Sequence, residues 1–597
     1  MKFSQVQSIF TGLLVSGALA APAPDWPAAP EWSSGPEPQP FIEPQILPEE
    51  GENILEERWS TVEAEIPSGG IVTGRSLLNV ESFNAIPYAD PPVGPLRLKP
   101  PRRFSGELGN IDGTGLAPVC PQLLVSSKSK DFIGKVANKI LDLPLLKGIQ
   151  GQEDCLTLNI QRPAGTKAGD KLPVLFWIFG GAFEIGGSAY HDATSLLATA
   201  MSQDQPFVFV AINHRVGGFG FMPGKEILAE GSSNVGLLDQ RMALEWVADN
   251  IEGFGGDPDK VTLWGLSSGG ISVFDQMLLY GGNATYKGKS LFRGAIINSG
   301  GTAPAEPIDC PKGQFVYDTV VQEAGCAGSN NTLECLRELD FDSFRKAANA
   351  VPAFFSYTSV GLSYLPRPDG KVLVDSPERL VETGQFHEVP MIIGNQEDEG
   401  TALALFQWNL TTAADMADYL HNVFFSNTPL EKLQEFVNLY EPARLQGSPH
   451  RTGFLNELYP GFKRVAAIIG DMVFTLSRRV MLKIVTRVKP QMPVWSYLAS
   501  YDYGTPFLGT FHGSDLIQVF YGILPNNAMR SSRTYYFNFL YNQDPNIGVG
   551  GYDHWPQWKE NNDLMWFKWA WSNDILKDDF RSTASDWIHE NANSIHI

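Results

Sequence analysis

The sequence predicts an α/β protein in which a large, mostly parallel central sheet is flanked by helices. Short, continuous apolar runs recur along the chain, at residues 172–179, 206–212, 261–264, 294–297, 389–393 and 494–498. Runs of this kind indicate strands that are buried on both faces, as the strands of parallel sheets are. Helical patterns lie between the runs, so strands and helices alternate.

The helix expected at 237–250 shows the alternation best. Leu238, Met242 and Trp246 recur every four residues and are expected to share the buried side of this helix. Asp239 and Arg241 are expected to lie off that side. The pattern therefore predicts a helix that packs on the sheet through one apolar stripe.

Three segments are expected along the 597 residues. Residues 1–20 combine Lys2, an apolar stretch and a small-x-small end at Ala20, which predicts a signal peptide. Residues 21–60 are acidic and Pro-rich, with no Lys or Arg before Arg58, which predicts a flexible arm. Residues 61–597 are expected to form a single catalytic domain. No later apolar stretch reaches the length of a transmembrane segment, so we expect a secreted, extracellular protein.

Composition limits the partners. The chain has 45 basic and 66 acidic residues, which gives a net charge of −21. This argues against nucleic acid or an anionic membrane as the main partner. Nothing in the sequence indicates an oligomeric state.

A candidate nucleophile lies in Gly265-Leu266-Ser267-Ser268-Gly269. This Gly-x-Ser-x-Gly motif follows the strand expected at 261–264 and precedes a helix expected at 270–279. A sharp strand–turn–helix junction exposes the serine oxygen, and the helix N-terminus offers N–H groups to a developing oxyanion. The setting predicts that Ser267 is a nucleophile. A Gly/Ser turn without chemistry is the alternative interpretation.

The donors of an oxyanion hole are expected in two places. One is the N–H of Ser268, directly after the nucleophile. The others come from the glycine-rich junction that follows the strand at 172–179, where Gly181 and Ala182 are the predicted donors.

The acid and the base are less well determined by pattern. Glu397, Asp398 and Glu399 all follow the strand at 389–393, and pattern alone does not choose among them. The chain order serine, acid, histidine requires a later histidine. His512 follows the strand at 494–498 and is favoured, with His450 and His554 as alternatives.

Together these motifs resemble the type-B carboxylesterase/lipase family, and most closely its secreted fungal and yeast lipases. The resemblance runs from about residue 62 to near the C-terminus. It includes the serine-site signature at 254–269, a second signature at 153–160, and the segments 86–92 and 363–370. It implies an α/β-hydrolase fold with a disulfide-bounded lid loop. It also implies Glu399 as the triad acid, with Asp398-Glu399-Gly400 and His512-Gly513 matching the family segments, and no metal or organic cofactor.

The resemblance further implies two disulfides, Cys120–Cys155 and Cys326–Cys335, and leaves Cys310 free. A lid is expected inside the first of them, at residues 131–147. Three sequons permit N-glycosylation, at Asn283, Asn330 and Asn409. Two residues depart from the family pattern: Leu266 replaces the usual glutamate before the nucleophile, and Ala182 replaces a glycine of the oxyanion loop.

The expected function is therefore a secreted serine carboxylic-ester hydrolase. The lid favours a lipase that cleaves long-chain acyl esters at a lipid–water interface. A carboxylesterase acting on small soluble esters and a sterol esterase are the alternatives. A non-catalytic, cholinesterase-like binding protein is least favoured, because such relatives usually lack a member of the triad, whereas Ser267, Glu399 and His512 are all present.

Overall fold

A computed structural model of the chain describes residues 59–128, 150–442 and 445–597. The predicted signal peptide, nearly all of the predicted arm and the predicted lid helix at 131–147 lie outside the described residues. Residues Arg58–Ile597 group into one compact unit.

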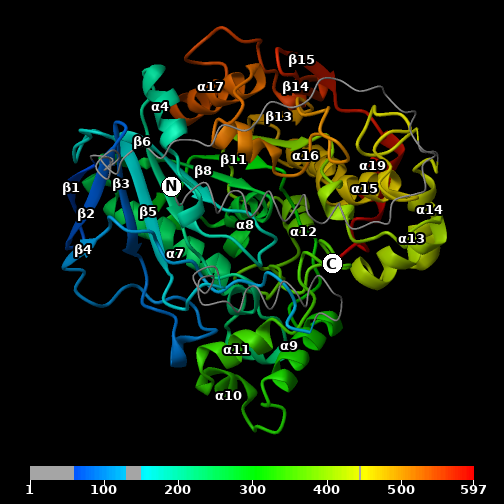
Figure 1. Cartoon of the computed structure of the whole chain (residues 1–597), viewed down its shortest axis with the longest axis horizontal. Coiled ribbons are helices and arrows are strands. Elements are labelled where there is room, and N and C mark those ends of the chain that lie inside the picture. Colours follow the sequence, from blue (N-terminus) through cyan, green and yellow to red (C-terminus); the bar gives the residue numbers. More distant parts are fainter. Residues whose placement is uncertain (1–58, 129–149, 443–444) are drawn as a thin grey trace, which may run out of the picture. The chain divides into compact units, whose positions relative to one another are not determined.

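A large mixed sheet runs through the protein, with a long parallel part at its centre (Figure 1). The strand order is β1-β2-β3-β5-β7-β6-β8-β11-β12-β13-β14-β15, with β4 paired to β2. In this order, neighbouring strands are antiparallel from β1 to β7, parallel from β7 to β14 and antiparallel at β14–β15, and β4 pairs with β2 in parallel. The predicted α/β fold with a mostly parallel core is confirmed.

The strands have the following bounds: β1 (Ser60–Glu65), β2 (Ile71–Leu77), β3 (Val80–Pro87), β4 (Asn110–Asp112), β5 (Thr157–Pro163), β6 (Leu172–Ile178), β7 (Val208–Ile212), β8 (Gly256–Leu266), β11 (Gly294–Asn298), β12 (Met391–Gln396), β13 (Val494–Ala499), β14 (Asp563–Trp569) and β15 (Ser572–Lys577). A separate small hairpin joins β9 (Thr285–Tyr286) and β10 (Lys289–Ser290). Each predicted apolar run overlaps a strand of the parallel part.

The helices have the following bounds: α4 (Thr194–Ser202), α5 (Gly217–Gly220), α6 (Lys225–Glu230), α7 (Val235–Asn250), α8 (Ser268–Gly282), α9 (Pro311–Glu323), α10 (Thr332–Glu338), α11 (Phe341–Ala348), α12 (Pro377–Glu382), α13 (Ala413–Tyr419), α14 (Leu430–Asn438), α15 (Phe462–Gly470), α16 (Leu476–Val488), α17 (Asn527–Asn542), α18 (Trp558–Asn561) and α19 (Ser582–Asn591). None of the helices in the described residues is long and apolar enough to cross a membrane.

Side chains of the parallel strands alternate between two apolar cores. In β6, Val174 and Phe176 belong to the core under α7, α8 and α16, whereas Leu175 and Trp177 belong to the core under α4 and α17. Figure 1 shows these helices on either side of the sheet. Both faces of each strand are therefore buried, which is why the strands read as continuous apolar runs.

Trp246 of the predicted apolar side of α7 is buried and Leu238 and Met242 pack against the core, but the exclusion of Asp239 and Arg241 from the buried side was wrong. Asp239 and Arg241 are buried, whereas Leu238 and Met242 are only partly buried. The physical reason is pairing. The Asp239 carboxylate accepts two hydrogen bonds from the Arg215 guanidinium, at 2.7 and 2.8 Å, and the Arg241 guanidinium donates to the side chain of Gln276 at 2.9 Å. Paired charges of this kind can occupy a buried side that a hydrophobicity pattern assigns to apolar residues.

The structure forms the two disulfides that the resemblance implies, Cys120–Cys155 and Cys326–Cys335, and Cys310 is free and buried. The sequon residues Asn283, Asn330 and Asn409 are exposed. Their glycosylation stays a prediction.

Candidate active site

Ser267 lies at the turn between β8 and α8. Its backbone has φ 58° and ψ −127°, and positive φ is uncommon for a residue other than glycine. Strained backbone of this kind persists where the surrounding structure holds it, and it clusters at functional sites. Here the Ser267 N–H donates to the carbonyl of Asn298, at the end of the neighbouring strand β11 (2.9 Å). The residue is partly exposed, so the turn presents its side chain at the edge of the sheet.

Two glycines allow this turn to form. A Cβ on Gly265 would lie 2.3 Å from the carbonyl oxygen of Gly269, and a Cβ on Gly269 would lie 2.1 Å from that of Ile178. Both distances are shorter than real Cβ contacts, so a larger residue would push the turn apart. The glycines thus bring the nucleophile turn against the end of β6, where the predicted oxyanion loop begins.

The loop that carries Gly181 and Ala182 starts beside Ser267. Ile178, the last residue of β6, pairs with Gly265 of β8. Gly181 and Ala182 both have positive φ, 134° and 58°. Within the described residues, no acceptor is recorded for the N–H groups of Gly181, Ala182 or Ser268. These N–H groups are therefore available to an oxyanion.

The three neighbouring carboxylates of the turn after β12 have different partners. Glu397 is paired with Arg451, whose Nε lies 3.0 Å from it. Asp398 accepts hydrogen bonds from the Ser448 hydroxyl and from the backbone N–H groups of His450 and Thr510, at 2.8 to 3.0 Å. Only the Glu399 carboxylate, among these three, contacts His512.

His512 Nδ1 lies 2.6 Å from Glu399 Oε2. The histidine ring packs on Phe474, with ring centres 4.6 Å apart. The Glu399 side chain is fully buried and the His512 side chain is 13% exposed. Of the alternative bases, His554 is exposed, and no carboxylate partner is recorded within the described residues for the ring of His450 or of His554.

Asn298 connects the nucleophile turn with the histidine loop. Its carbonyl accepts from Ser267, and its side-chain amide donates to Asp515 Oδ2 at 2.6 Å. Burial raises the pKa of Asp515 to about 6, a rise that the hydrogen bond from Asn298 opposes. Sequence analysis missed both residues, although the position of Asp515, three residues after His512, was a usable signal.

An apolar cavity lies beside the first turn of α8. Ile271 lines it and lies one helical turn after Ser267, whose carbonyl accepts from the Ile271 N–H at 2.9 Å. Met472 and Val473 line it from the π-helical turn η7 (Asp471–Thr475), which also carries Phe474. The cavity continues between α16 and the C-terminal segment, along Val480, Met481, Ile484, Ile588, Ile595 and Ile597.

The residues of the candidate site thus follow four strands that end at the same edge of the sheet. The predicted oxyanion loop follows β6, Ser267 follows β8, Glu399 follows β12 and His512 follows β13. This is the carboxyl edge of parallel strands, where α/β proteins place their sites. The arrangement is suited to nucleophilic attack by a serine with a histidine base and a carboxylate partner.

Comparisons with known proteins agree with this chemistry. The chain matches the model of the carboxylesterase family over residues 39–577. It is 60% identical to the "Secreted triacylglycerol lipase LIP1" of Gibberella zeae over 91% of this chain and 92% of that protein. It is 52% identical to "Secreted lipase 1" of Botryotinia fuckeliana over 91% and 95%. Among solved structures, Aspergillus niger EstA is similar with a TM-score of 0.75 and 24% identity, over 90% of this chain and 99% of that one. The last similarity concerns the fold alone.

Proposed function

The chain belongs to the carboxylesterase family, and from this premise we propose that it is a secreted serine lipase that hydrolyses long-chain acyl esters. The hydrogen bond between His512 and Glu399, at the same sheet edge as Ser267, is the observation that carries the proposal of an ester hydrolase. The names of the similar fungal proteins support both secretion and lipase activity.

In the proposed mechanism, the Ser267 oxygen attacks the carbonyl carbon of the ester while His512 takes the serine proton. The N–H groups of Gly181, Ala182 and Ser268 stabilise the negative oxygen of the tetrahedral intermediate, and loss of one such donor typically costs about 100- to 1000-fold in rate.

The bond to the leaving alcohol then breaks, and His512 gives that alcohol its proton. A water molecule attacks the acyl-enzyme in the same way and releases the carboxylic acid. Glu399 holds the histidine in its orientation and stabilises the imidazolium that forms in both steps.

The apolar cavity supports long acyl chains as substrates. Ile271, one helical turn after the nucleophile, lines it, and the turn η7 that supplies Met472 and Val473 also carries Phe474, which packs on the base. A chain bound there leaves water, which contributes about 0.8 kcal/mol for each buried methylene. Met472 and Met481 line the cavity, and flexible methionine side chains adapt to chains of different length.

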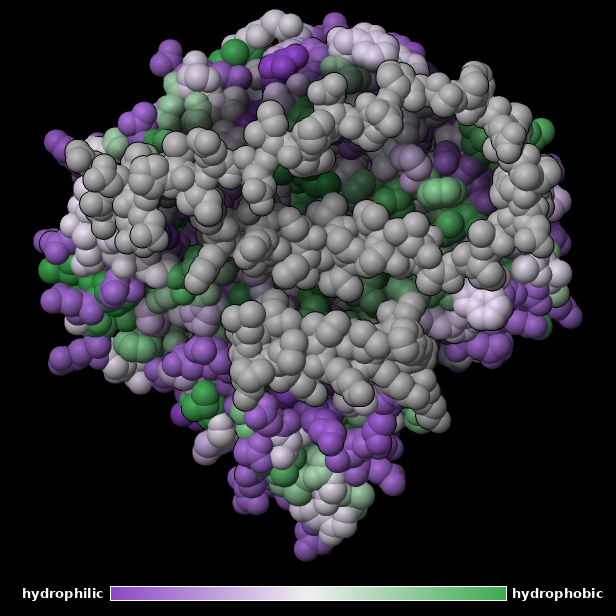
Figure 2. Space-filling view, viewed as in Figure 1, coloured by the Kyte–Doolittle hydropathy of each residue, from purple (hydrophilic) through white to green (hydrophobic). Residues whose placement is uncertain are grey.

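Exposed apolar side chains support action at a lipid surface. Phe454 and Leu455 are 71% and 60% exposed, and Phe507 is 40% exposed. Their loops touch, because the Phe507 N–H donates to Asn456, and the second of these loops leads to His512. Figure 2 shows apolar residues near the centre of one face, with polar residues more frequent at its edge. Exposed apolar groups on adjacent loops fit an enzyme that binds its substrate at an interface.

The test compares wild-type protein with Ser267→Ala on three substrates: a short p-nitrophenyl ester, an emulsified long-chain triacylglycerol and a cholesteryl ester. We expect wild type to hydrolyse the triacylglycerol, with a rate that rises once the substrate forms an emulsion. Ser267→Ala should fold, be secreted and lose nearly all activity, since loss of a triad member normally costs several powers of ten.

Other outcomes would point to the alternatives. Activity confined to soluble short esters, with no response to an emulsion, would make the protein a carboxylesterase. A preference for the cholesteryl ester would make it a sterol esterase. Wild-type protein that hydrolyses none of the three would indicate the non-catalytic binding protein, and activity of Ser267→Ala within tenfold of wild type would contradict Ser267 as nucleophile.

A further inference from the structure

The two oxygens of the Glu399 carboxylate have different partners. Oε2 faces the histidine, whereas Oε1 accepts from the Gln396 N–H at 2.9 Å and from the side-chain amide of Asn395 at 3.1 Å. Asn395 lies at the end of β12 and is fully buried. The side of the carboxylate that faces away from the base is therefore held by a second side chain, which the proposed mechanism does not use.

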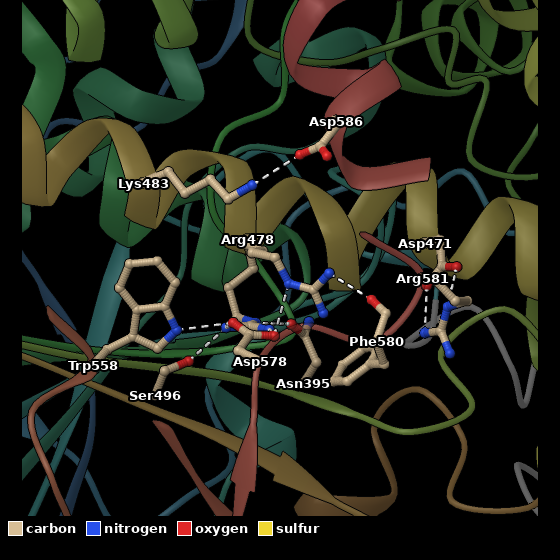
Figure 3. A network of polar contacts seen from close by, with 11 residues as sticks. Asn395, Asp471, Arg478, Lys483, Ser496, Trp558, Asp578, Phe580, Arg581 and Asp586 are labelled. Carbon is tan, nitrogen blue, oxygen red and sulfur yellow. Dashed lines mark hydrogen bonds and ion pairs between the residues drawn. The ribbon is translucent and has the colours of Figure 1, made fainter. Parts of the chain in front are cut away.

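The opposite side of Asn395 is fixed by a guanidinium. Arg478 Nε donates to Asn395 Oδ1 at 2.9 Å (Figure 3). A guanidinium can only donate, so it selects the amide oxygen and turns the amide NH₂ group towards Glu399. Arg478 and Glu399 together therefore determine which end of the Asn395 amide carries the oxygen and which the nitrogen.

Arg478 is itself held rigidly. Its two terminal nitrogens bind both oxygens of Asp578, at 2.8 and 2.9 Å, and one of them also donates to the Ser496 hydroxyl at 2.8 Å. Asp578 in addition accepts from Trp558 Nε1 and from Arg479 Nε, each at 2.9 Å. Arg478 and Asp578 are completely buried, so bidentate pairing fixes the guanidinium in one place.

The cluster also carries a net positive charge. Arg478 and Arg479 carry two positive charges, and Asp578 carries one negative charge. One positive charge remains, and Asn395 lies between it and Glu399. Hydrogen bonds to the ionised form and nearby positive charge both stabilise a buried carboxylate.

From these contacts we propose that Asn395 is a positioning residue, which transmits the fixed orientation of the Arg478–Asp578 pair to Glu399 and through it to His512. The proposal rests on the proposed function, because it assigns Glu399 as the triad acid. Asn395 does not touch the substrate. It determines which carboxylate oxygen is left for the base.

The test uses Asn395→Asp, which has nearly the same shape. The new carboxylate keeps an oxygen for Arg478, with which it pairs well, but faces Glu399 with an oxygen that carries no hydrogen. Two carboxylates at this distance repel or share a proton. For a short soluble ester we therefore expect kcat to fall about tenfold with KM within about twofold, and the acidic limb of the pH profile to move up by about half a unit or more.

Two further variants complete the experiment. Asn538→Asp is the matched control, since Asn538 in α17 is also buried and its amide donates to the carbonyls of Pro545 and Val549 in the loop after this helix. It should lower the melting temperature without moving the acidic limb. Asn395→Leu removes both contacts without adding charge and carries the test if Asn395→Asp does not fold. It should lower kcat with little change in KM.

The outcomes separate this inference from the proposed function. If Asn395→Asp has the kcat and the pH profile of wild type, Asn395 merely anchors Arg478 and the inference is overturned. Wild-type kcat in Asn395→Leu would overturn it equally. Ser267→Ala is assayed beside these variants: an active Ser267→Ala overturns the proposed function, whereas an inactive Ser267→Ala with an unaffected Asn395→Asp overturns only the positioning role.

Discussion

Substitution of Ile271 by tryptophan tests whether the cavity beside Ser267 binds the acyl chain. Ile271 lines the cavity one helical turn after Ser267 and is partly buried, so a larger side chain there should obstruct the cavity. The cavity then loses its contribution to binding, while the short acyl group of an acetate ester, which does not extend into it, is spared.

The expected magnitude follows from the length of chain that is excluded. Each methylene that leaves water contributes about 0.8 kcal/mol, so exclusion of four methylenes costs about 3 kcal/mol. This corresponds to roughly 200-fold in kcat/KM, at tenfold for each 1.4 kcal/mol. We expect Ile271→Trp to keep its activity on p-nitrophenyl acetate within about threefold, and to lose about two powers of ten on the palmitate ester.

The assay is a series of p-nitrophenyl esters from two to sixteen carbons, measured for wild type, Ile271→Trp and Ile547→Trp. Ile547 is 56% exposed and is absent from the cavity wall, so its substitution controls for the added tryptophan. An equal loss at every chain length would indicate general damage to the active site. An unchanged chain-length profile would refute the assignment of this cavity to the acyl chain.

Two other predictions concern ionisable side chains. His512→Ala should be far less active on the short ester than His450→Ala or His554→Ala, and an inactive His554→Ala would contradict the assigned base. Burial raises the pKa of Asp275 to about 8, and within the described residues neither of its oxygens has a partner. The folded state therefore holds a proton that the unfolded chain releases above about pH 4, so stability should decline between about pH 4 and pH 8. Asp275→Asn should remove this loss of stability, which is on the order of a few kcal/mol. The check is the melting temperature of both proteins at pH 5 and pH 8: an equal change in wild type and in Asp275→Asn would contradict the prediction.

The parallel core of the fold could be predicted because burial on both faces leaves a simple signal. Strands such as β6 and β7 consist almost entirely of apolar residues, so they stand out as runs. The edge strand β15 has partly or fully exposed residues throughout, and its sequence begins Ser572-Asn-Asp. An edge strand of this kind is fixed by pairing with β14 and not by its own hydrophobicity, so the sequence analysis did not find it.

The side of α7 that packs inward shows a different limit. Hydrophobic periodicity assumes that charged residues face water, which held for neither Asp239 nor Arg241. Each is buried because it has a partner elsewhere in the chain: Asp239 pairs with Arg215, and Arg241 with Gln276. A partner that is remote in sequence leaves no local signal, so such pairs can be located only in three dimensions.

In the candidate site, too, the choice of the triad acid depends on partners that are remote in sequence. Glu397, Asp398 and Glu399 are consecutive carboxylates, and side-chain chemistry alone gives no reason to prefer one. In the structure, Asp398 holds the loops of Ser448 and Thr510, and Glu397 is paired with Arg451, which leaves Glu399 for His512. Of the two acids that are not assigned to the triad, Asp398 binds the loop that carries the base, and Glu397 binds the loop of Arg451. Burial, together with the charge of Glu397 beside it, raises the pKa of Asp398 to about 7, so this anchor loses its proton near neutral pH. The position of the base thus depends on Asp398 as well as on Glu399, although only Glu399 contacts it.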